Sequence, residues 1–472
     1  MKTAVTYLVK PNHYKALFQF ADRNSALAKN LYNAALFRIR QTFTGWKKTS
    51  WSSNEREVFL ELANTKVAYP SLVIKQCLSY KALDKVMRVN RNPDFFAGLP
   101  MQTAQAVLKQ AVSDFKNWLA ALSDYGKHPD KYTGRPKMPK YKKSEQATFI
   151  LTNQDAVIYP VYDKDGNPVP GCIILKLPGM KKNYPILYGF TSDGRLKQVT
   201  VKPFCGYYIL SLVIESADIP VRNDLPNMAG LDFGTDNIAA LACTDGSSVV
   251  FKGGAVLSEN RWFAKKKADA VSDITRGHEH MHAQSHHLDR LSLSHSFRNT
   301  NFMHQCSRKI IDWCTDHKVG ILVIGRNKNW KQNADMGKKN NQKFESVPHS
   351  QLLQLIEFKA MKAGIRVIEQ EESYTSKADV SANDFMPVYG EESDRPCSFS
   401  GMRTKRGLYR THEGYFINAD CNGAANILRK AIPDAWNDAA DFHFLGVPEV
   451  MSYKKIIGAA IADGTEEYMS AI

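Results

Sequence analysis

Residues 229–240 read AGLDFGTDNIAA, an apolar run that ends at Asp232 and is followed by a glycine, Gly234, before a second apolar run begins. This pattern predicts two strands joined by a turn, with the aspartate at the end of the first strand. Near the C-terminus, residues 417–427 read INADCNGAANI and place Asp420 just before an Asn- and Gly-rich helix start. Carboxylate oxygens are hard ligands that Mg²⁺ prefers, and paired ions bind the attacking and leaving oxygens of a phosphodiester. Either aspartate alone is weak support, but together they predict a divalent-metal site.

The chain is strongly basic, with 63 Lys and Arg against 47 Asp and Glu and a formal net charge of +16 over 472 residues. Such an excess favours a polyanionic partner, most commonly nucleic acid, and the alternative is an ordinary basic soluble enzyme. No apolar run reaches the roughly 20 residues of a membrane span, and the N-terminus lacks the apolar stretch of a signal peptide. The eight cysteines form no CxxC pair. This argues against a disulfide framework or zinc ribbon and favours a reducing cytoplasm with no membrane partner.

The first half of the chain changes from helical to strand patterns. Residues 1–15 alternate like a strand, and helical spacing then recurs over four segments: 21–41, 55–65, 71–89 and 101–122. From 147 to 216 short strands are separated by Asp-Gly and Pro-Gly turns, and with the N-terminal strand they are expected to close a small barrel. Between the two zones, residues 126–143 combine Lys, Arg, Pro, Gly and Tyr with almost no acid. That stretch is either an extended contact for phosphates and bases or a solvated linker.

Beyond residue 227 the strand and helix patterns alternate. The predicted strands cover 228–233, 238–244, 247–251, 319–324 and 365–368, and the predicted helices cover 261–291, 302–316, 350–363 and 422–431. Residues 384–414 are expected to form a loop insertion. The order βββ–α–β–α–β–α predicts an RNase H-like layer with its carboxylates at one edge of the sheet.

The chain resembles the TnpB family of transposon-encoded RNA-guided DNA nucleases, the relatives of small type V CRISPR effectors. The similar stretches are 31–41 (LYNAALFRIRQ), 99–110 (LPMQTAQAVLKQ), 134–142 (GRPKMPKYK), 230–239 (GLDFGTDNIA), 374–377 (YTSK) and 418–428 (NADCNGAANIL). The resemblance implies a multidomain α+β fold in which a helical recognition domain is inserted in a β-barrel wedge domain, followed by a RuvC nuclease domain. The corresponding segments are 1–18 and 147–222 (wedge), 19–125 (recognition), 126–146 (basic linker) and 227–472 (RuvC-like), with a zinc-free insertion at about 378–416.

The family's catalytic residues are Asp, Glu and Asp, and here Asp232 matches the first and Asp420 the third. The glutamate that usually follows the fourth strand is replaced by Gly325. Glu371 and Glu372 instead stand at the end of the next strand, where some members carry this glutamate, and neighbouring strands lie only about 5 Å apart. Because side chains alternate along a strand, only one of the two is expected to be a ligand. The resemblance implies Glu372, which stands three residues before Thr375, where such members carry the glutamate. If neither is a ligand, the enzyme is inactive.

The resemblance also implies cofactors and partners. Asp232, Glu372 and Asp420 would hold two Mg²⁺ ions, for which Mn²⁺ can substitute. No zinc is expected, because only Cys397 stands where many relatives carry two CxxC pairs. The partners are a guide RNA and double-stranded target DNA, and protein partners are left open. The residues expected to contact nucleic acid are Arg135, Lys137, Lys140, Tyr141, Lys142, Arg403, Lys405 and Arg406. The histidines in 278–287 are expected on a solvated or RNA-facing helix.

The resemblance thus implies an RNA-guided DNA endonuclease that cuts next to a short adjacent motif, in the prokaryotic cytoplasm at the nucleoid. The alternative is a catalytically inactive RNA-guided DNA-binding protein that represses transcription. Gly325 favours that alternative, whereas the retained Asp232 and Asp420 argue against it. A transposase that joins DNA ends is a third reading, but no separate end-binding domain is recognisable. A transposon-encoded nuclease and a CRISPR effector share these motifs.

Overall fold

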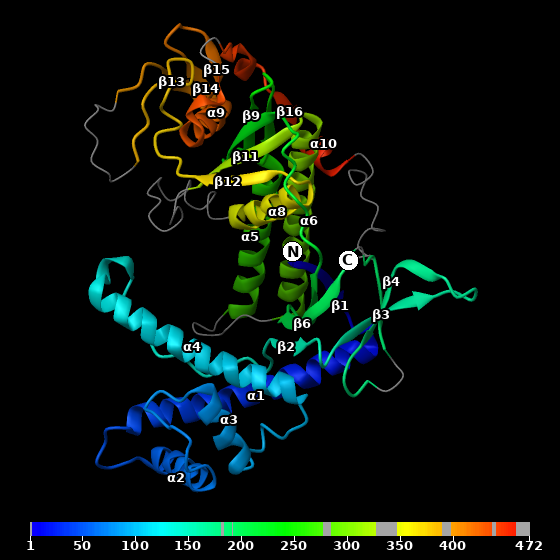
Figure 1. The fold of residues 1–472 in the computed structure, drawn as a ribbon, viewed down its shortest axis with the longest axis vertical. Helices are drawn as coiled ribbons and strands as arrows, with labels where there is room; N and C mark the ends of the chain where they lie inside the picture. The colour runs from blue at the N-terminus through cyan, green and yellow to red at the C-terminus, as the bar shows by residue number, and fades with distance from the viewer. Residues whose placement is uncertain are drawn as a thin grey trace. The chain divides into compact units, whose positions relative to one another are not determined.

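The computed structural model describes residues 2–180, 184–190, 192–276, 285–326, 347–388, 398–436 and 440–458. The fold is mixed α/β with several sheets (Figure 1). The chain divides into two units, the first ending at Ala217 and the second beginning at Asp218. Within the described ranges, every helix is too short or too polar to cross a membrane.

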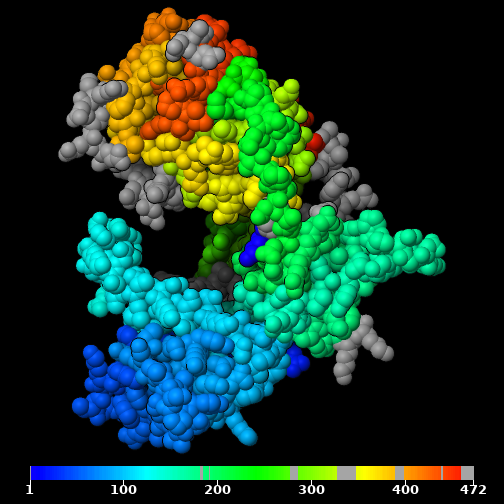
Figure 2. All heavy atoms as spheres, viewed as in Figure 1, coloured from blue at the N-terminus to red at the C-terminus, as the bar shows by residue number. Residues whose placement is uncertain are grey.

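The first unit contains two antiparallel sheets. One has four strands in the order β1 (Lys2–Val9), β7 (Tyr207–Glu215), β6 (Arg195–Phe204) and β2 (Phe149–Thr152). The other has three strands in the order β3 (Val157–Tyr162), β4 (Pro168–Lys176) and β5 (Ile186–Tyr188). The β3–β4 hairpin projects from the rest of this unit (Figures 1 and 2). The described strands therefore pair as two sheets, and the predicted barrel is not confirmed.

Helices are inserted between β1 and β2: α1 (Lys15–Gly45), α2 (Ser53–Ala68), α3 (Tyr80–Val89), α4 (Met101–Lys127) and the short η1 (Pro129–Lys131). Three of the four predicted helices are confirmed and are longer than predicted. The prediction over 71–89 is wrong in its first half, because the Ser79 side chain accepts a hydrogen bond from the Ala82 amide and begins α3 there. Leu31, Leu108 and Leu212 belong to one buried cluster, so the helices and the four-stranded sheet share a core.

The second unit is built on a six-stranded sheet. Its order is β12 (Arg366–Gln370), β11 (Val319–Gly325), β8 (Asn227–Asp232), β9 (Asn237–Cys243), β10 (Ser248–Lys252) and β16 (Glu449–Met451). The strands β8, β9 and β10 are antiparallel neighbours, whereas β11 runs parallel to β8 and β12 runs parallel to β11. The carboxyl ends of β8, β11 and β12 therefore lie at one edge of the sheet, as predicted.

Helices cover both faces of this sheet. They are α5 (Gly254–Thr275), α6 (His286–Asp316), α8 (His349–Lys362), α9 (Ala419–Ala431), α10 (Tyr453–Ile457), η2 (Pro433–Ala435) and η3 (Phe442–Gly446). One buried cluster joins α6 and α8 to one face, and α9 packs on the other. The single helix predicted over 261–291 is wrong, because α5 ends at Thr275 and the Ser285 side chain caps the start of α6. Short strands β13 (Met402–Lys405), β14 (Leu408–Arg410) and β15 (Phe416–Asn418) precede α9.

The contact of α9 with β8 depends on a glycine in the strand. A Cβ atom at Gly230 would lie 1.9 Å from the carbonyl oxygen of Ala424 in α9 and 3.0 Å from the Cβ of Leu428. Only a residue without a side chain lets the helix backbone come this close to the strand. The approach matters for function, because it brings the start of α9 beside the end of β8.

Substituting Gly230 by Ala is expected to lower the free energy of unfolding by about 3 kcal/mol, the upper range for overpacking, since backbone must move to admit the methyl group. Urea unfolding of the full chain measures this. Gly254→Ala is the matched control, because a Cβ at Gly254 would meet no atom within 4 Å. Equal stability of the two variants would contradict the close approach of α9.

Candidate active site

Three carboxylates converge on the sheet edge at which β8, β11 and β12 end. Asp232 is the last residue of β8. Glu372 follows the end of β12 by two residues. Asp420 lies in the first turn of α9, where the side chain of Asn418 accepts hydrogen bonds from the Asp420 and Cys421 amides and fixes the helix start. The sequence-predicted residues Asp232, Glu372 and Asp420 are thus brought together.

Glu372 and Asp420 both influence the charge state of Asp232. The pKa of Asp232 is raised well above its ordinary value, first by burial and then by the negative charges of Glu372 and Asp420. Burial also raises the pKa of Glu372 to about 7, with a further contribution from Glu371. Like charges that are forced together in a partly dry site favour the protonated form. Such a group of carboxylates is stabilised by any cation that binds among them.

The two candidate glutamates, Glu371 and Glu372, interact with different groups. Glu371 Oε2 lies 2.5 Å from Lys430 Nζ near the end of α9, and Glu371 Oε1 accepts a hydrogen bond of 2.8 Å from the Ser373 amide. Burial raises the pKa of Glu371, but the hydrogen bonds from Lys430 and Ser373 outweigh burial, and the net pKa is lowered. Glu371 is therefore held in an ion pair, whereas Glu372 acts on Asp232. This geometry favours Glu372 as the third carboxylate.

Gly325 provides the space that Glu372 occupies. It ends β11 and pairs with Gln370 of β12. A Cβ atom at Gly325 would lie 2.8 Å from Glu372 Oε2 and 2.5 Å from Ile427 Cδ1. A glutamate at position 325 would compete with Glu372 for the same volume. The space that a side chain at position 325 would fill is therefore taken up by Glu372 and Ile427.

Polar side chains on α9, which the sequence patterns did not single out, fix the segment that follows Glu372. Asn422 Nδ2 donates to the Ala378 carbonyl at 2.8 Å, and Asn426 Nδ2 donates to the Thr375 and Ala378 carbonyls at 3.0 and 2.7 Å. Arg429 donates to the Asp384 carbonyl at 2.8 Å. The i, i+4 spacing of the two asparagines on one helix face was the available signal. These buried bonds hold the segment that carries Glu372 to the helix that carries Asp420.

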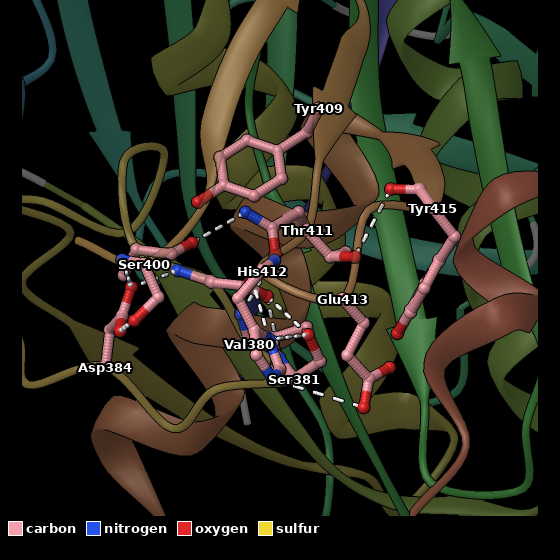
Figure 3. A network of polar contacts seen from close by, with 12 residues as sticks. Val380, Ser381, Asp384, Ser400, Tyr409, Thr411, His412, Glu413 and Tyr415 are labelled. Atoms are coloured by element: carbon pink, nitrogen blue, oxygen red, sulfur yellow. Dashed lines mark hydrogen bonds and ion pairs between the residues drawn. The ribbon is translucent and has the colours of Figure 1, made fainter.

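Two buried aspartates organise the insertion that precedes α9 (Figure 3). Asp384 accepts hydrogen bonds from the Asp379 amide at 2.8 Å and from the Ser400 amide and hydroxyl at 2.9 and 2.6 Å. Asp379 accepts from the His412 amide at 2.7 Å and from the Ser381 hydroxyl at 2.6 Å. Carboxylates bonded to backbone amides thus tie the described part of the insertion together. Cys397 lies outside the described residues.

Asp420 has two further contacts. Asn237 Nδ2 donates to Asp420 Oδ2 at 2.7 Å, and the Arg403 guanidinium lies 3.3 Å from Asp420 Oδ1. Arg403 comes from β13, and Arg406, next to that strand, pairs with Asp236 at 2.6 Å. Of the three basic residues predicted on this hairpin, Arg403 therefore contacts a carboxylate of the site, Arg406 pairs with Asp236, and Lys405 is exposed.

The basic segment 126–146 in the first unit is fixed against α1 and α4. Trp118 Nε1 donates to the Pro136 carbonyl, Arg40 donates to the Pro139 carbonyl, and Asn33 bonds both the amide and the carbonyl of Lys142. The side chains predicted to contact nucleic acid are exposed: Arg135, Lys137, Lys140, Tyr141 and Lys142. The Arg40 guanidinium covers the Tyr141 ring at 5.0 Å, and Lys142 Nζ covers the Tyr32 ring at 4.3 Å. The segment is thus an anchored strap that presents basic groups.

The carboxylate site suits a divalent cation in its donor chemistry. Among the described residues, no group of three or more His, Cys, Asp and Glu side chains is arranged so that it could hold a metal ion. The donors are nevertheless hard oxygens, and their mutual repulsion would be relieved by Mg²⁺. A Cβ at Gly423 would lie 2.7 Å from Asp232 Oδ2, so a second glycine clears the space around these carboxylates. Of the histidines in 278–287, positions 278, 280 and 282 lie outside the described residues, and His286 and His287 are exposed at the start of α6.

Two family models match the chain. One is described as a probable transposase (OrfB of IS605) and matches residues 211–331, and the other is the Cas12f1-like TNB domain and matches residues 349–427. A TnpB-like protein, ORF457 of Acidianus two-tailed virus, is 25% identical over 213 residues, which are 43% of this chain and 42% of that protein. The match thus spans less than half the length of the viral relative.

Solved structures of CRISPR effectors also align over most of the chain. They include a Cas12f1–sgRNA–target DNA complex (13% identity, TM-score 0.32, covering 92% of this chain and 100% of that one). A second is CasPhi-2 (Cas12j) bound to crRNA and phosphorothioate DNA (9%, TM-score 0.38, 93% of each chain). A third is the Cas12i1 R-loop complex after target DNA cleavage (8% identity, TM-score 0.39, covering 92% of this chain and 67% of that one). At such TM-scores these structures support no argument about the site.

Proposed function

Because the chain belongs to the TnpB family, we propose that it is an RNA-guided DNA endonuclease of the RuvC type that cuts target DNA next to a short adjacent motif. The observation that supports this most is the convergence of Asp232, Glu372 and Asp420 on one sheet edge, with Gly325 leaving room for the relocated glutamate. Its substrates are RNA-paired DNA strands, so we expect it to act in the prokaryotic cytoplasm at the nucleoid.

In this proposal the three carboxylates hold two Mg²⁺ ions, and Mn²⁺ can replace them. When bound, these ions lower the pKa of an attacking water and stabilise the leaving 3′ oxygen of the phosphodiester. Asp232 and Asp420 contribute from the sheet and from the helix start, and Glu372 completes the set from the neighbouring strand end. Arg403, which pairs with Asp420, is placed to hold the phosphate beside the carboxylates.

The nucleic acids would be bound mainly through their backbones. Base pairing between guide RNA and target strand reads the sequence, while basic protein surfaces hold the heteroduplex by its shape and charge. The strap at 126–146 and the β13–β14 hairpin present exposed Lys and Arg for this purpose. The RNA could come from a transposon end or a CRISPR array, which share this chemistry.

The test is to purify the full chain from cells, sequence the RNA that accompanies it, and assay Mg²⁺-dependent cutting of DNA that matches the variable end of that RNA. We expect one discrete RNA and cutting directed by it. Binding directed by the RNA without cutting would instead support the catalytically inactive repressor. Gly325 favours that alternative, whereas the position of Glu372 beside Gly325 supports cutting. Absence of any specific RNA would contradict the proposal.

Substitution of Gly325 by Ala tests the relocation of the glutamate. The added methyl group would displace the ends of Glu372 and Ile427, and disturbing a carboxylate ligand's support costs about 10- to 100-fold in metal affinity or activity. We therefore expect cutting at fixed Mg²⁺ to slow by about tenfold or more. The comparison is with Gly254→Ala, and equal cutting rates in both variants would count against Glu372 as a ligand.

A further inference from the structure

Asn237 links the candidate site to a lysine on the neighbouring strand. It begins β9 and is buried. Its Nδ2 donates to Asp420 Oδ2 at 2.7 Å, and its Oδ1 accepts from Lys252 Nζ at 2.8 Å. Lys252 stands opposite Asn237 in the β9–β10 register, and α9 packs against β9 (Figure 1). A chain of two hydrogen bonds therefore runs from Lys252 through Asn237 to Asp420.

The donors and acceptors of Lys252, Asn237 and Asp420 determine which way the Asn237 amide is turned. A lysine ammonium has only donors, so the asparagine atom that faces Lys252 must be the carbonyl oxygen. The amide nitrogen then faces Asp420, whose ionised carboxylate only accepts. Rotating the amide by half a turn would place donor against donor and acceptor against acceptor. Lys252 thus orients Asn237, and Asn237 in turn orients Asp420.

An amide suits this place because it is neutral. The Arg403 guanidinium lies 3.3 Å from Asp420 Oδ1, and a lysine in direct contact with Oδ2 would add a second positive charge where a divalent cation has to bind. The Asn237 amide engages one lone pair of Oδ2 and restricts rotation of the carboxylate, and it leaves the second lone pair of Oδ2 available. The ammonium of Lys252 remains one residue further away and polarises the amide.

We propose that Asn237, oriented by Lys252, is a positioning residue that presets the Asp420 carboxylate for a divalent cation. This inference rests on the proposed nuclease function. Partners that orient a ligand carboxylate through hydrogen bonds typically contribute 10- to 100-fold to metal affinity, which sets the expected effect at about that size.

The test uses Asn237→Leu, which keeps the approximate shape of the side chain and removes its donor and acceptor. Mn²⁺ binding to the full chain, freed of nucleic acid by high-salt chromatography, is followed by electron paramagnetic resonance. The half-saturating Mg²⁺ for cutting is measured in the RNA complex. We expect Mn²⁺ binding to weaken and half-saturating Mg²⁺ to rise by about 10- to 100-fold, with the cutting rate recovering at high Mg²⁺. Lys252→Met should shift both in the same direction by a smaller factor.

Thr244→Val is the matched control at the other end of β9, because the Thr244 hydroxyl accepts one hydrogen bond from the Met228 amide at 3.0 Å. It should alter thermal unfolding without changing metal dependence. Suppose that Asn237→Leu, like Thr244→Val, leaves Mn²⁺ binding unchanged while Asp420→Ala weakens it. Asn237 then has only a structural role, and the inference fails while the proposed nuclease function stands. If the wild-type chain binds no Mn²⁺ at this site, so that Asp420→Ala changes nothing, the inference and the proposed nuclease function fail together.

Discussion

Asp232→Ala is expected to slow DNA cutting by more than about 100-fold, beyond the range for residues that only support a metal ligand. Asp232 is the carboxylate whose pKa is raised by burial and by both Glu372 and Asp420, so it lies where their charges meet. Guide RNA binding should be unchanged, because that contact depends on basic surfaces elsewhere. Asp420→Ala should have an effect of similar size.

The same substitution should not weaken the fold. Removing one of three mutually repelling carboxylates relieves repulsion in the absence of metal, so the melting temperature of Asp232→Ala without Mg²⁺ should equal or exceed that of the wild type. Cutting rates and thermal unfolding of the same preparations check this. A variant that retains cutting, or that loses cutting only because it unfolds, would contradict the assignment of Asp232.

Glu372→Gln and Glu371→Gln form the second decisive test, since they make the same chemical change at adjacent residues. Glu372→Gln should reduce cutting by more than about 100-fold, as expected for loss of a direct metal ligand. Glu371→Gln should reduce cutting by less than about tenfold, below the usual cost of disturbing a ligand's support. Single-turnover cutting of a matched DNA target at saturating Mg²⁺ measures both.

The free energy of unfolding should show the opposite order: Glu371→Gln, which has the smaller effect on cutting, should be the less stable variant. Lys430 is 7% exposed and pairs with Glu371, so Glu371→Gln leaves a buried ammonium with a neutral partner, at a cost of about 1–3 kcal/mol. Glu372→Gln removes a charge that opposes Asp232 and should not destabilise the chain. If Glu371→Gln abolished cutting in a folded protein and Glu372→Gln did not, the roles would be reversed.

Local patterns predicted most of the second unit. Five of the six strands of its sheet follow from apolar patterns, and β16 was not predicted. The positions of Asp232 and Asp420 follow from an acid that stands beside glycine or asparagine. Glu372 could be predicted because the register of parallel strands places the ends of β11 and β12 side by side. The resemblance favours Glu372 over Glu371, and the contact of Glu371 with Lys430, which the sequence does not indicate, supports the same choice.

Features that depend on distant partners were not predictable in the same way. Pairing of β1 with β7 and of β3 with β4 decides between one barrel and two sheets, and periodicity does not specify pairing. The role of Asn237 depends on Lys252 and Asp420, which are 15 and 183 residues away in the chain. The sequence analysis gives Asn422 and Asn426 no role beyond the predicted helix, yet they bind the segment after Glu372.

The most direct test of the central claim, that this chain cuts DNA at the Asp232, Glu372 and Asp420 site, measures binding and cutting in one tube. A labelled duplex that matches the RNA is incubated with the complex in Mg²⁺ or in EDTA, and bound and cleaved fractions are read together, beside Asp232→Ala. The account predicts binding in every sample and cutting only by the wild type in Mg²⁺. Binding with no cutting by the wild type in Mg²⁺ would contradict it and identify a guided DNA-binding protein.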